Sequence, residues 1–296
     1  MILAVTGITG HTGRYFLEEL VRGGFDGTLR VLVRASSDTR LLDASGLKVE
    51  KVVGELQNGE DLFRLVEGAD RVMHIAGIRV TLPLLAAAER AGFRGHMVLV
   101  HTTGIYSRHR MASGEYKDIE AKMQPYLARG MNVTILRPTM IFGDMCDHNI
   151  HKFIRMVDAF PVMPQIDGGR AFIQPVNARD LGRAYYQCVM KERLPELDYI
   201  CSGSRRLSVR ELCSLIGIYL GKKTRFVSVP MAVGAAGAWG VKTLSGGRID
   251  YVEKVLRLGE DRSFSHEKAT RDFGFEPEIF EIGLRREVEE YLHGKR

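Results

Sequence analysis

Three glycines spaced as GxxGxxG form the segment of this sequence with the most specific chemistry. They follow a short β-branched run and open an amphipathic segment, which is the order of a strand, a tight loop and a helix. Glycine lets backbone amides approach a pyrophosphate, and the free amides and positive dipole at a helix start attract that anion. An ordinary glycine-rich turn is the alternative, which this context disfavours. The predicted dinucleotide-binding residues of the loop are Gly7, Thr9, Gly10, His11, Thr12 and Gly13.

A cation stands where the second strand-like run ends. Dinucleotide-binding proteins that select NAD usually place a carboxylate there, which binds the ribose 2′-hydroxyl. Arg34 holds the position in this chain, and Ser36, Ser37 and Arg40 follow within reach. A guanidinium can bind a 2′-phosphate through two hydrogen bonds, so NADP is favoured over NAD. Asp38 keeps NAD as the alternative if the loop folds back, and a solvated surface cation is the remaining interpretation of Arg34.

The elements that must position these residues alternate in type. Short β-branched runs recur at 2–6, 29–33, 48–53, 71–75, 96–101 and 132–136. Amphipathic segments lie between the runs, among them 12–22, 81–91 and 116–128. This alternation predicts a doubly wound parallel sheet, a Rossmann fold of the α/β class, whose ligand crevice lies beyond the carboxyl ends of the strands.

The pattern loosens after residue 140 and then recovers a helix at 178–191 and a strand at 198–201. Further helices are expected at 208–220, 250–258 and 280–292. We expect 1–143, together with 170–202, to form the dinucleotide-binding Rossmann domain. Residues 144–169 and 203–296 are then expected to form a smaller C-terminal lobe that binds substrate.

The bulk composition excludes several classes of protein. The 296 residues carry a net charge of +6, which suits an anionic ligand but is too small an excess to indicate nucleic acid. The four cysteines have no metal-type spacing, which predicts reduced thiols in a cytoplasmic protein. The stretch 231–241 is apolar but far short of the roughly twenty residues that cross a bilayer. It is expected to be a packed helix, and no membrane partner is predicted.

Polar residues outside the loop allow weaker hypotheses. His148 and His151 are three residues apart without a third ligand, so we expect surface or substrate-loop histidines and no metal. Basic residues around the second lobe form either a diphosphate clamp or a set of solvated charges. These residues are Lys191, Arg193, Arg205 and Arg206.

With the loop, the motifs HIAG at 74–77 and RPTMIFG at 137–143 make the chain resemble the extended and atypical short-chain dehydrogenases/reductases. Residues 174–176 with Asp180, and the closing segment 263–277, are similar to the nucleotide-sugar epimerase/dehydratase branch. The resemblance implies that the loop after the third strand touches adenine, and that the HIAG and RPT segments lie along the cofactor and flank the nicotinamide. The residues implied are Glu55, Leu56, Ala76, Gly77, Pro138, Thr139 and Met140.

The family's reaction centre is a Ser or Thr after the fifth strand and a Tyr-x-x-x-Lys pair on the next helix. There the lysine lowers the pKa of the tyrosine, so that a phenolate can exchange a proton while hydride moves at the nicotinamide. Thr102, four residues before Tyr106, fits the hydroxyl position, and Thr103 is the one-residue alternative.

The tyrosine–lysine pair is incomplete. Lys117 fits the lysine position, but the residue four earlier is Ser113, and Tyr116 is followed four later by Glu120. Tyr116 and Lys117 are adjacent, hence about 100° apart around a helix. Three interpretations follow: Lys117 works without the tyrosine, Tyr106 or Tyr116 reaches in from an irregular segment, or the cofactor is bound without turnover.

The resemblance therefore implies an NAD(P)-dependent epimerase, dehydratase or reductase that acts on a nucleotide sugar or a related carbonyl or hydroxyl compound. In this hypothesis Thr102 polarises a substrate oxygen and Lys117 holds the nicotinamide ribose. The alternative is a non-catalytic NADP-binding redox sensor or regulatory protein of the atypical branch. The family's habit also implies a homodimer through the helices at 81–91 and 116–128.

Overall fold

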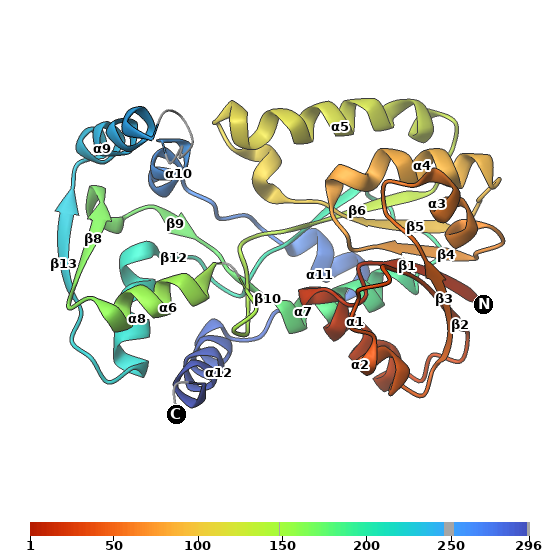
Figure 1. Ribbon diagram of the computed structural model, residues 1–296, viewed down its shortest axis with the longest axis horizontal. Helices are drawn as coiled ribbons and strands as arrows, with labels where there is room; N and C mark the ends of the chain where they lie inside the picture. The colour runs from red at the N-terminus through yellow and green to blue at the C-terminus, as the bar shows by residue number, and fades with distance from the viewer. Residues whose placement is uncertain (148, 246–251, 295–296) are drawn as a thin grey trace.

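Seven parallel strands form the central sheet, in the order β11-β6-β5-β4-β1-β2-β3. The computed structural model describes residues 1–147, 149–245 and 252–294 (Figure 1). The strands are β1 (Ile2–Thr6), β2 (Thr28–Val33), β3 (Lys48–Val53), β4 (Arg71–His74), β5 (His96–Val100), β6 (Val133–Pro138) and β11 (Asp198–Cys201). The order reverses between β1 and β4, and ligands of such sheets bind at this switch point.

Helices cover both faces of the sheet, which is why the central strands are mostly apolar. One face carries α1 (His11–Arg22), α7 (Ala178–Val189) and α11 (Glu267–Phe273). The other carries α3 (Gly59–Val66), α4 (Thr81–Arg90) and α5 (Arg110–Ala128). All five residues of β5 are buried between the two layers. The short helix α2 (Arg40–Asp43) follows β2.

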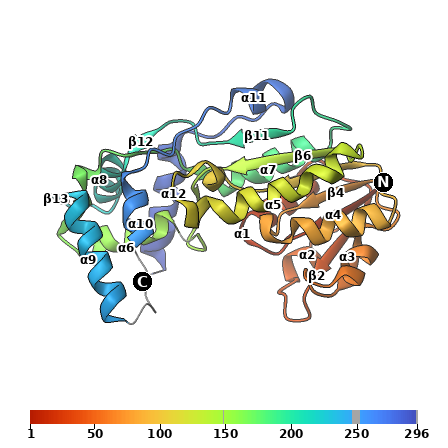
Figure 2. The same cartoon turned by 90° about the horizontal axis from the view of Figure 1, so that it is seen from above.

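A separate apolar core lies beyond the sheet, among α6 (Ile150–Ala159), α8 (Val209–Tyr219) and α12 (Phe280–His293). Figure 2 shows this part and the seven-stranded sheet at opposite ends of the molecule. Three two-stranded sheets lie outside the central one. They are β7 (Ile141–Phe142) with β10 (Val176–Asn177), β9 (Phe172–Ile173) with β12 (Leu207–Ser208), and β8 (Val162–Ile166) with β13 (Arg225–Val229).

The predicted doubly wound α/β fold is confirmed, and the predicted strands 2–6, 48–53 and 198–201 match β1, β3 and β11 in both bounds. Helix α5 begins at Arg110, six residues before the predicted start. Of the predicted helix 250–258, residues 250 and 251 lie outside the described residues. The rest forms α10 (Val252–Leu256) and a 3₁₀ turn, η4 (Arg257–Gly259).

The stretch 231–241 forms a helix, α9 (Met231–Leu244), but the expectation that it packs into the protein is wrong. Only Ala238 of its fourteen residues is buried. In the described ranges, no helix combines the length and the apolar character needed to cross a membrane. We propose the division into two lobes given above, except that α11 is assigned to the Rossmann lobe because Ala269 and Phe273 lie in its core.

Candidate functional site

The loop between β1 and α1 has the backbone geometry that a pyrophosphate requires. Gly7 has φ +76°, and a Cβ there would lie 2.8 Å from the amide nitrogen of Ala76. A Cβ on Gly13 would overlap the carbonyl oxygen of Gly7, so only glycine lets α1 start this close to β1. No side chain caps the first turn of α1. Its amides are therefore available to an anion, as expected for the whole loop Gly7 to Gly13.

Asp144 binds the side chains at the start of α1. Its carboxylate accepts hydrogen bonds from His11 Nε2 at 3.0 Å and from the Tyr15 hydroxyl at 2.6 Å, and it also pairs with Arg14. Burial opposes ionisation of Asp144, but the bonds from His11 and Tyr15 outweigh it and hold the pKa well below its ordinary value. The predicted binding residue His11 thus offers its main chain, while its imidazole is engaged.

A buried histidine joins the ends of β1 and β4. His74 Nε2 lies 3.1 Å from the carbonyl oxygen of Gly77, which can only accept, so this nitrogen carries the proton. His74 Nδ1 then accepts from the Thr6 hydroxyl at 2.7 Å. Burial lowers the pKa of His74 to about 4, which keeps the ring neutral. His74 is buried, and it orients the loop at Ala76 and Gly77.

The loop after β2 exposes one arginine and neutralises another. Arg40 donates to both oxygens of Asp38, at 2.9 and 2.6 Å, and its hydrogen bonds lower the pKa of Asp38 to about 2. The side chain of Arg34 is exposed and has no hydrogen-bond or ion-pair partner within the described ranges, while its amide donates to Ser37 Oγ at 3.1 Å. The free cation in this loop is therefore Arg34, and Asp38 is already bound.

The loop after β3 is held by a carboxylate. The amide of Glu55 donates to Asp61 Oδ2 at 2.9 Å, and Leu56 packs against the core beneath α3 and α4. The side chain of Glu55 is exposed. Both residues named for the adenine end of the cofactor thus lie on one surface loop at the carboxyl edge of the sheet.

Two of the residues predicted for the reaction centre, Thr102 and Tyr116, lie at the loop after β5. Thr102 precedes the 3₁₀ helix η2 (Thr103–Tyr106), and its Oγ1 accepts from the Gly104 amide at 3.0 Å. The Thr103 hydroxyl instead donates to the carbonyl of Pro138 at 3.1 Å. The Tyr116 ring lies against the same loop, since a Cβ on Gly104 would come within 3.2 Å of it. The structure therefore brings Thr102 and Tyr116 together.

Two other predicted groups are placed differently. Lys117 is exposed, and its side chain has no hydrogen-bond or ion-pair partner within the part of the chain that the structure describes. The Tyr106 hydroxyl donates to Asp198 Oδ2 at 3.2 Å, and Asp198 is the first residue of β11. Tyr106 therefore has a partner outside the reaction centre.

Glu120, four residues after Tyr116 on α5, is part of a largely buried charge network. It accepts from Arg137 at 2.6 and 2.8 Å and lies 2.8 Å from His101 Nδ1. Arg137 also donates to Asp198 at 2.7 Å. Burial opposes the charge of Glu120, but the hydrogen bonds from His101 and Arg137 prevail and lower its pKa to about 2. Glu120 therefore positions α5 and does not face a ligand.

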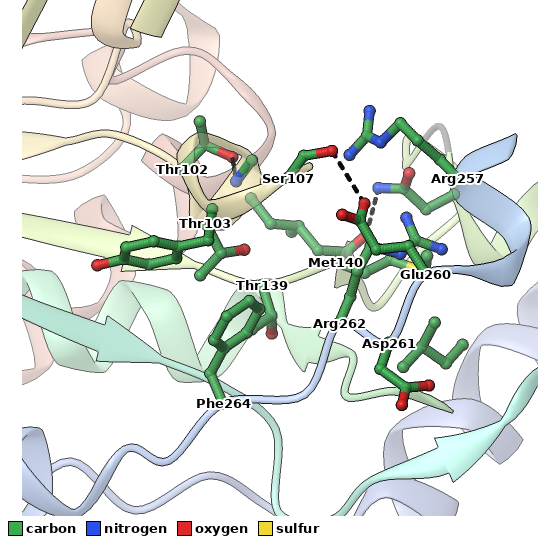
Figure 3. Close-up of a pocket in the computed structure, with 15 residues that line it drawn as sticks. Thr102, Thr103, Ser107, Thr139, Met140, Arg257, Glu260, Asp261, Arg262 and Phe264 are labelled. Atoms are coloured by element: carbon green, nitrogen blue, oxygen red, sulfur yellow. Dashed lines mark hydrogen bonds between the residues drawn. The ribbon is translucent and has the colours of Figure 1, made fainter. Parts of the chain in front are cut away.

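A cavity of about 290 Å³ opens between the two lobes next to Thr102 (Figure 3). Thr139 and Met140, expected beside the nicotinamide, line it as well. Figure 3 shows Thr102 on the left and Arg257 on the right, with Arg262 between the lobes. The full lining is Thr102, Thr103, Gly104, Tyr106, Ser107, Thr139, Met140, Ile141, Asn149, Ile173, Arg257, Glu260, Asp261, Arg262 and Phe264.

Two arginines in this lining were not predicted. The side chains of Arg257 and Arg262 have no hydrogen-bond or ion-pair partner among the described residues, and the Nε atom of each is buried. Burial lowers the pKa of Arg262. Glu260 between them is engaged, by the Ser107 hydroxyl at 2.9 Å and the Arg108 amide at 2.7 Å. The one sequence signal near them is the family-like segment 263–277, which begins directly after Arg262.

The four basic residues considered as a diphosphate clamp lie outside this lining. Arg205 is paired with Glu211 and Glu281, at 2.8 and 2.6 Å. The carbonyl of Lys191 lies at the amino edge of the sheet, where it accepts from His96 at 2.9 Å. Arg257 and Arg262 therefore replace these four residues as the candidates for binding a diphosphate.

The loop after β7 contains no recognisable metal cluster within the described ranges. His148 lies outside the described residues. The Asp147 side chain is buried and accepts from the Asn149 amide at 2.5 Å. No metal role follows from this loop.

Comparison with known proteins agrees with this geometry. Residues 7–153 match the family described as NAD(P)H-binding. The chain is 28% identical over 178 residues to sterol demethylase protein B of Methylococcus capsulatus, covering 48% of this chain and 52% of that protein. It is also 28% identical over 174 residues to ceramide reductase of Caulobacter vibrioides, covering 55% and 53%. The chain thus spans about half the length of the curated relatives it matches.

Solved structures extend the likeness over the whole chain. A nucleoside-diphosphate-sugar epimerase from Pseudomonas aeruginosa superposes with a TM-score of 0.75 at 19% identity, covering 99% of this chain and 98% of that one. The dTDP-glucose 4,6-dehydratase from Bacillus anthracis, solved in complex with NAD, gives 0.74 at 17% identity, covering 100% and 97%. The first half of the chain therefore resembles the NAD(P)H-binding family. The fold of the whole chain is that of the extended short-chain dehydrogenases/reductases, as its motifs predict.

Proposed function

We propose that the protein is an NADP(H)-dependent enzyme that transfers hydride between the nicotinamide and a hydroxyl- or carbonyl-bearing carbon of a small anionic substrate. The observation that carries this proposal is the cavity between the lobes, where Thr102 and two unpaired arginines line the same space. This hydride step is common to the reductases, epimerases and dehydratases that the sequence resembles. A nucleotide sugar is one substrate of the required chemistry.

The hydrogen bonding of Thr102 fits a role in polarising the substrate oxygen. Its Oγ1 accepts the Gly104 amide, so its own proton is left to donate to a substrate. Tyr116 lies against the same loop, and its hydroxyl has no hydrogen-bond partner among the described residues. In this proposal Lys117, exposed on α5, holds the nicotinamide ribose.

The choice of NADP rests on the loop after β2. Arg34 is the unpaired cation there, whereas Asp38 is bound by Arg40 and does not compete for ribose hydroxyls. A free guanidinium at this position favours a 2′-phosphate.

The anionic character of the substrate rests on Arg257 and Arg262. Guanidinium groups that are partly buried without a carboxylate partner are unfavourable until an anion reaches them. The names of the relatives point to substrates that differ widely, a ceramide in one case and dTDP-glucose in another. The two arginines favour substrates that carry a phosphate or carboxylate.

A second candidate function, a cofactor-binding sensor without turnover, is favoured by one observation. Ser113 stands four residues before Lys117, where the family has its tyrosine, and its hydroxyl donates to the carbonyl of His109 at 3.2 Å. A protein without this tyrosine lacks the family's proton relay.

Turnover of NADPH with a panel of carbonyl compounds and nucleotide sugars tests the proposal. We expect Thr102→Val to lower kcat about a hundredfold, with NADPH affinity unchanged. Arg262→Gln should raise KM for anionic substrates and leave neutral ones unaffected. Ser45→Ala, on a distant loop, is the control. Tight NADPH binding by a native chain that turns over no substrate would contradict the enzyme proposal and favour the sensor.

A further inference from the structure

Helix α9 presents an uncharged surface to solvent. Its sequence, MAVGAAGAWGVKTL, has a single charged residue, Lys242. The helix rests on the protein through its small residues, because a Cβ on Gly234 would contact Ile166 of β8 and Val255 of α10. The exposed fractions of its larger apolar residues are 61% for Val233, 63% for Trp239 and 91% for Leu244. A surface helix in water normally turns a charged face outward. The exposed apolar face of α9 is instead typical of a surface that a binding partner covers.

The strand that leads into α9 continues the apolar surface. Val227 of β13 pairs in register with Pro164 of β8, and Val162 lies two residues before it on the same face. All three side chains are exposed. Figures 1 and 2 both place α9 and β13 at the end of the molecule away from the seven-stranded sheet.

Basic residues predominate in the sequence around this surface. Between residues 212 and 245 the chain contains Lys222, Lys223, Arg225 and Lys242 and no acidic residue, and Lys222 is paired with Asp158. Arg225 shares the exposed face of β13 with Val227. Asp167, which approaches α9 from a preceding turn, accepts the amide of Met231 at 2.9 Å and so caps the helix. An apolar face in a basic surrounding is complementary to a bilayer with anionic headgroups.

We propose that α9 docks the protein on the surface of a membrane that contains anionic lipids. The fourteen residues of α9 extend about 21 Å, short of the roughly 30 Å of a hydrocarbon core, so the helix lies in the interface and does not span it. Trp239 is placed at the headgroup level, where its ring is favoured. This docking is independent of the proposed catalytic function and revises the expectation of a packed helix.

The chain contains one tryptophan, and it lies on α9, so the fluorescence of the full-length protein reports on this helix alone. We expect the Trp239 emission to shift to shorter wavelength with vesicles of phosphatidylcholine and phosphatidylserine, and much less with phosphatidylcholine alone. High salt should reverse the shift in part. Unchanged emission with the mixed vesicles would overturn the proposal, and so would an equal shift with both vesicle types.

Two substitutions at exposed positions test the surface without disturbing the core. Val233→Glu and Leu244→Glu should each weaken vesicle binding about tenfold or more, because each removes an apolar contact and adds a repelled charge. Leu41→Glu is the matched control, since Leu41 is 66% exposed on α2 at the other end of the molecule. Equal vesicle binding by all three variants would overturn the proposal.

A second copy of the chain is the competing occupant of this surface. Analytical ultracentrifugation without lipid separates the two. We expect the same sedimentation for the native chain and Val233→Glu. Self-association that Val233→Glu abolishes, with no binding to vesicles, would assign the surface to a dimer and overturn the membrane proposal.

Discussion

Glu120 accepts two hydrogen bonds from Arg137, at 2.6 and 2.8 Å, which join α5 to β6. His101 lies 2.8 Å from the same carboxylate. Glu120 is therefore an anchor between α5 and the strands β5 and β6. Any proton transfer at Thr102 must use other groups.

Removing this anchor should destabilise the fold. We expect Glu120→Gln to lower the free energy of unfolding by about 3 kcal/mol, because it leaves the buried Arg137 without its main counter-charge. Denaturant unfolding at pH 7 measures the change. Glu115→Gln is the control, since its pair with Arg79 is exposed, and it should change stability by less than about 1 kcal/mol. Equal effects of the two variants would contradict the anchor role.

The same anchor predicts acid sensitivity. The pKa of Glu120 is about 2 in the folded protein and about 4.3 in an unfolded chain. A lowered pKa contributes stability above the unfolded value, and this contribution is lost as the pH falls toward 2. Thermal unfolding between pH 7 and pH 2.5 should therefore show the native protein and Glu120→Gln converging at the acid end. A constant difference would rule out the ionised pair as its source.

Cofactor choice is testable at one side chain. Arg34→Gln should weaken NADPH binding about tenfold to a hundredfold, as expected for the loss of charged hydrogen bonds to a phosphate, and leave NADH binding unchanged. Isothermal calorimetry with both cofactors gives the ratio. Arg129→Gln, at an exposed arginine paired with Glu89, is the control. An equal loss of NADH affinity in Arg34→Gln would mean that Arg34 does not recognise the 2′-phosphate.

The fold was predictable from local sequence because each element carries its own signal. The strand Lys48–Val53 and the loop at Gly7 to Gly13 are recognised within a few residues, and their order fixes the topology. The small sheets β7-β10, β9-β12 and β8-β13 were not predicted. Each joins strands of two to five residues that lie far apart in the chain.

The residues of the site also divide into those that local sequence predicts and those that it does not. Thr102 follows a strand and could be found from its motif, whereas Arg257 and Arg262 reach the cavity only after the second lobe has folded over the sheet. Whether a side chain finds a partner is also a tertiary property. The sequence of α9 suggests burial, and the fold leaves the helix exposed because none of the described elements covers its outer face.

The phosphate loop gives a steric prediction. Gly13→Ala should weaken binding of either dinucleotide at least about a hundredfold, because the added Cβ overlaps the Gly7 carbonyl and must displace the start of α1. Gly59→Ala is the matched control: it is also in a first helical turn, and its Cβ meets no atom within 4 Å. Calorimetry measures the affinities, and circular dichroism confirms that both variants fold. Full affinity in Gly13→Ala would contradict the close approach seen here.

Asp180 gives the opposite pH dependence to Glu120. It lies buried in the first turn of α7, where it accepts the Glu278 amide at 3.1 Å and pairs with Arg183. Burial, with a smaller effect of the Glu278 charge, raises the pKa of Asp180 to about 6. A raised carboxyl pKa contributes stability below the unfolded value near 3.9, and that contribution is lost as the pH rises through 6.

Asp180→Asn does not titrate, so its stability relative to the native protein should improve by about 2 kcal/mol between pH 4 and pH 7 and then stay level. Asp61→Asn is a control of opposite sign. The Glu55 amide and Arg64 lower the pKa of Asp61. The stability of the native protein relative to Asp61→Asn should therefore increase as the pH rises toward 4. Unfolding of the three proteins at matched pH values measures both trends. A flat difference for Asp180→Asn would show that the native Asp180 carboxylate is not penalised by its burial at α7.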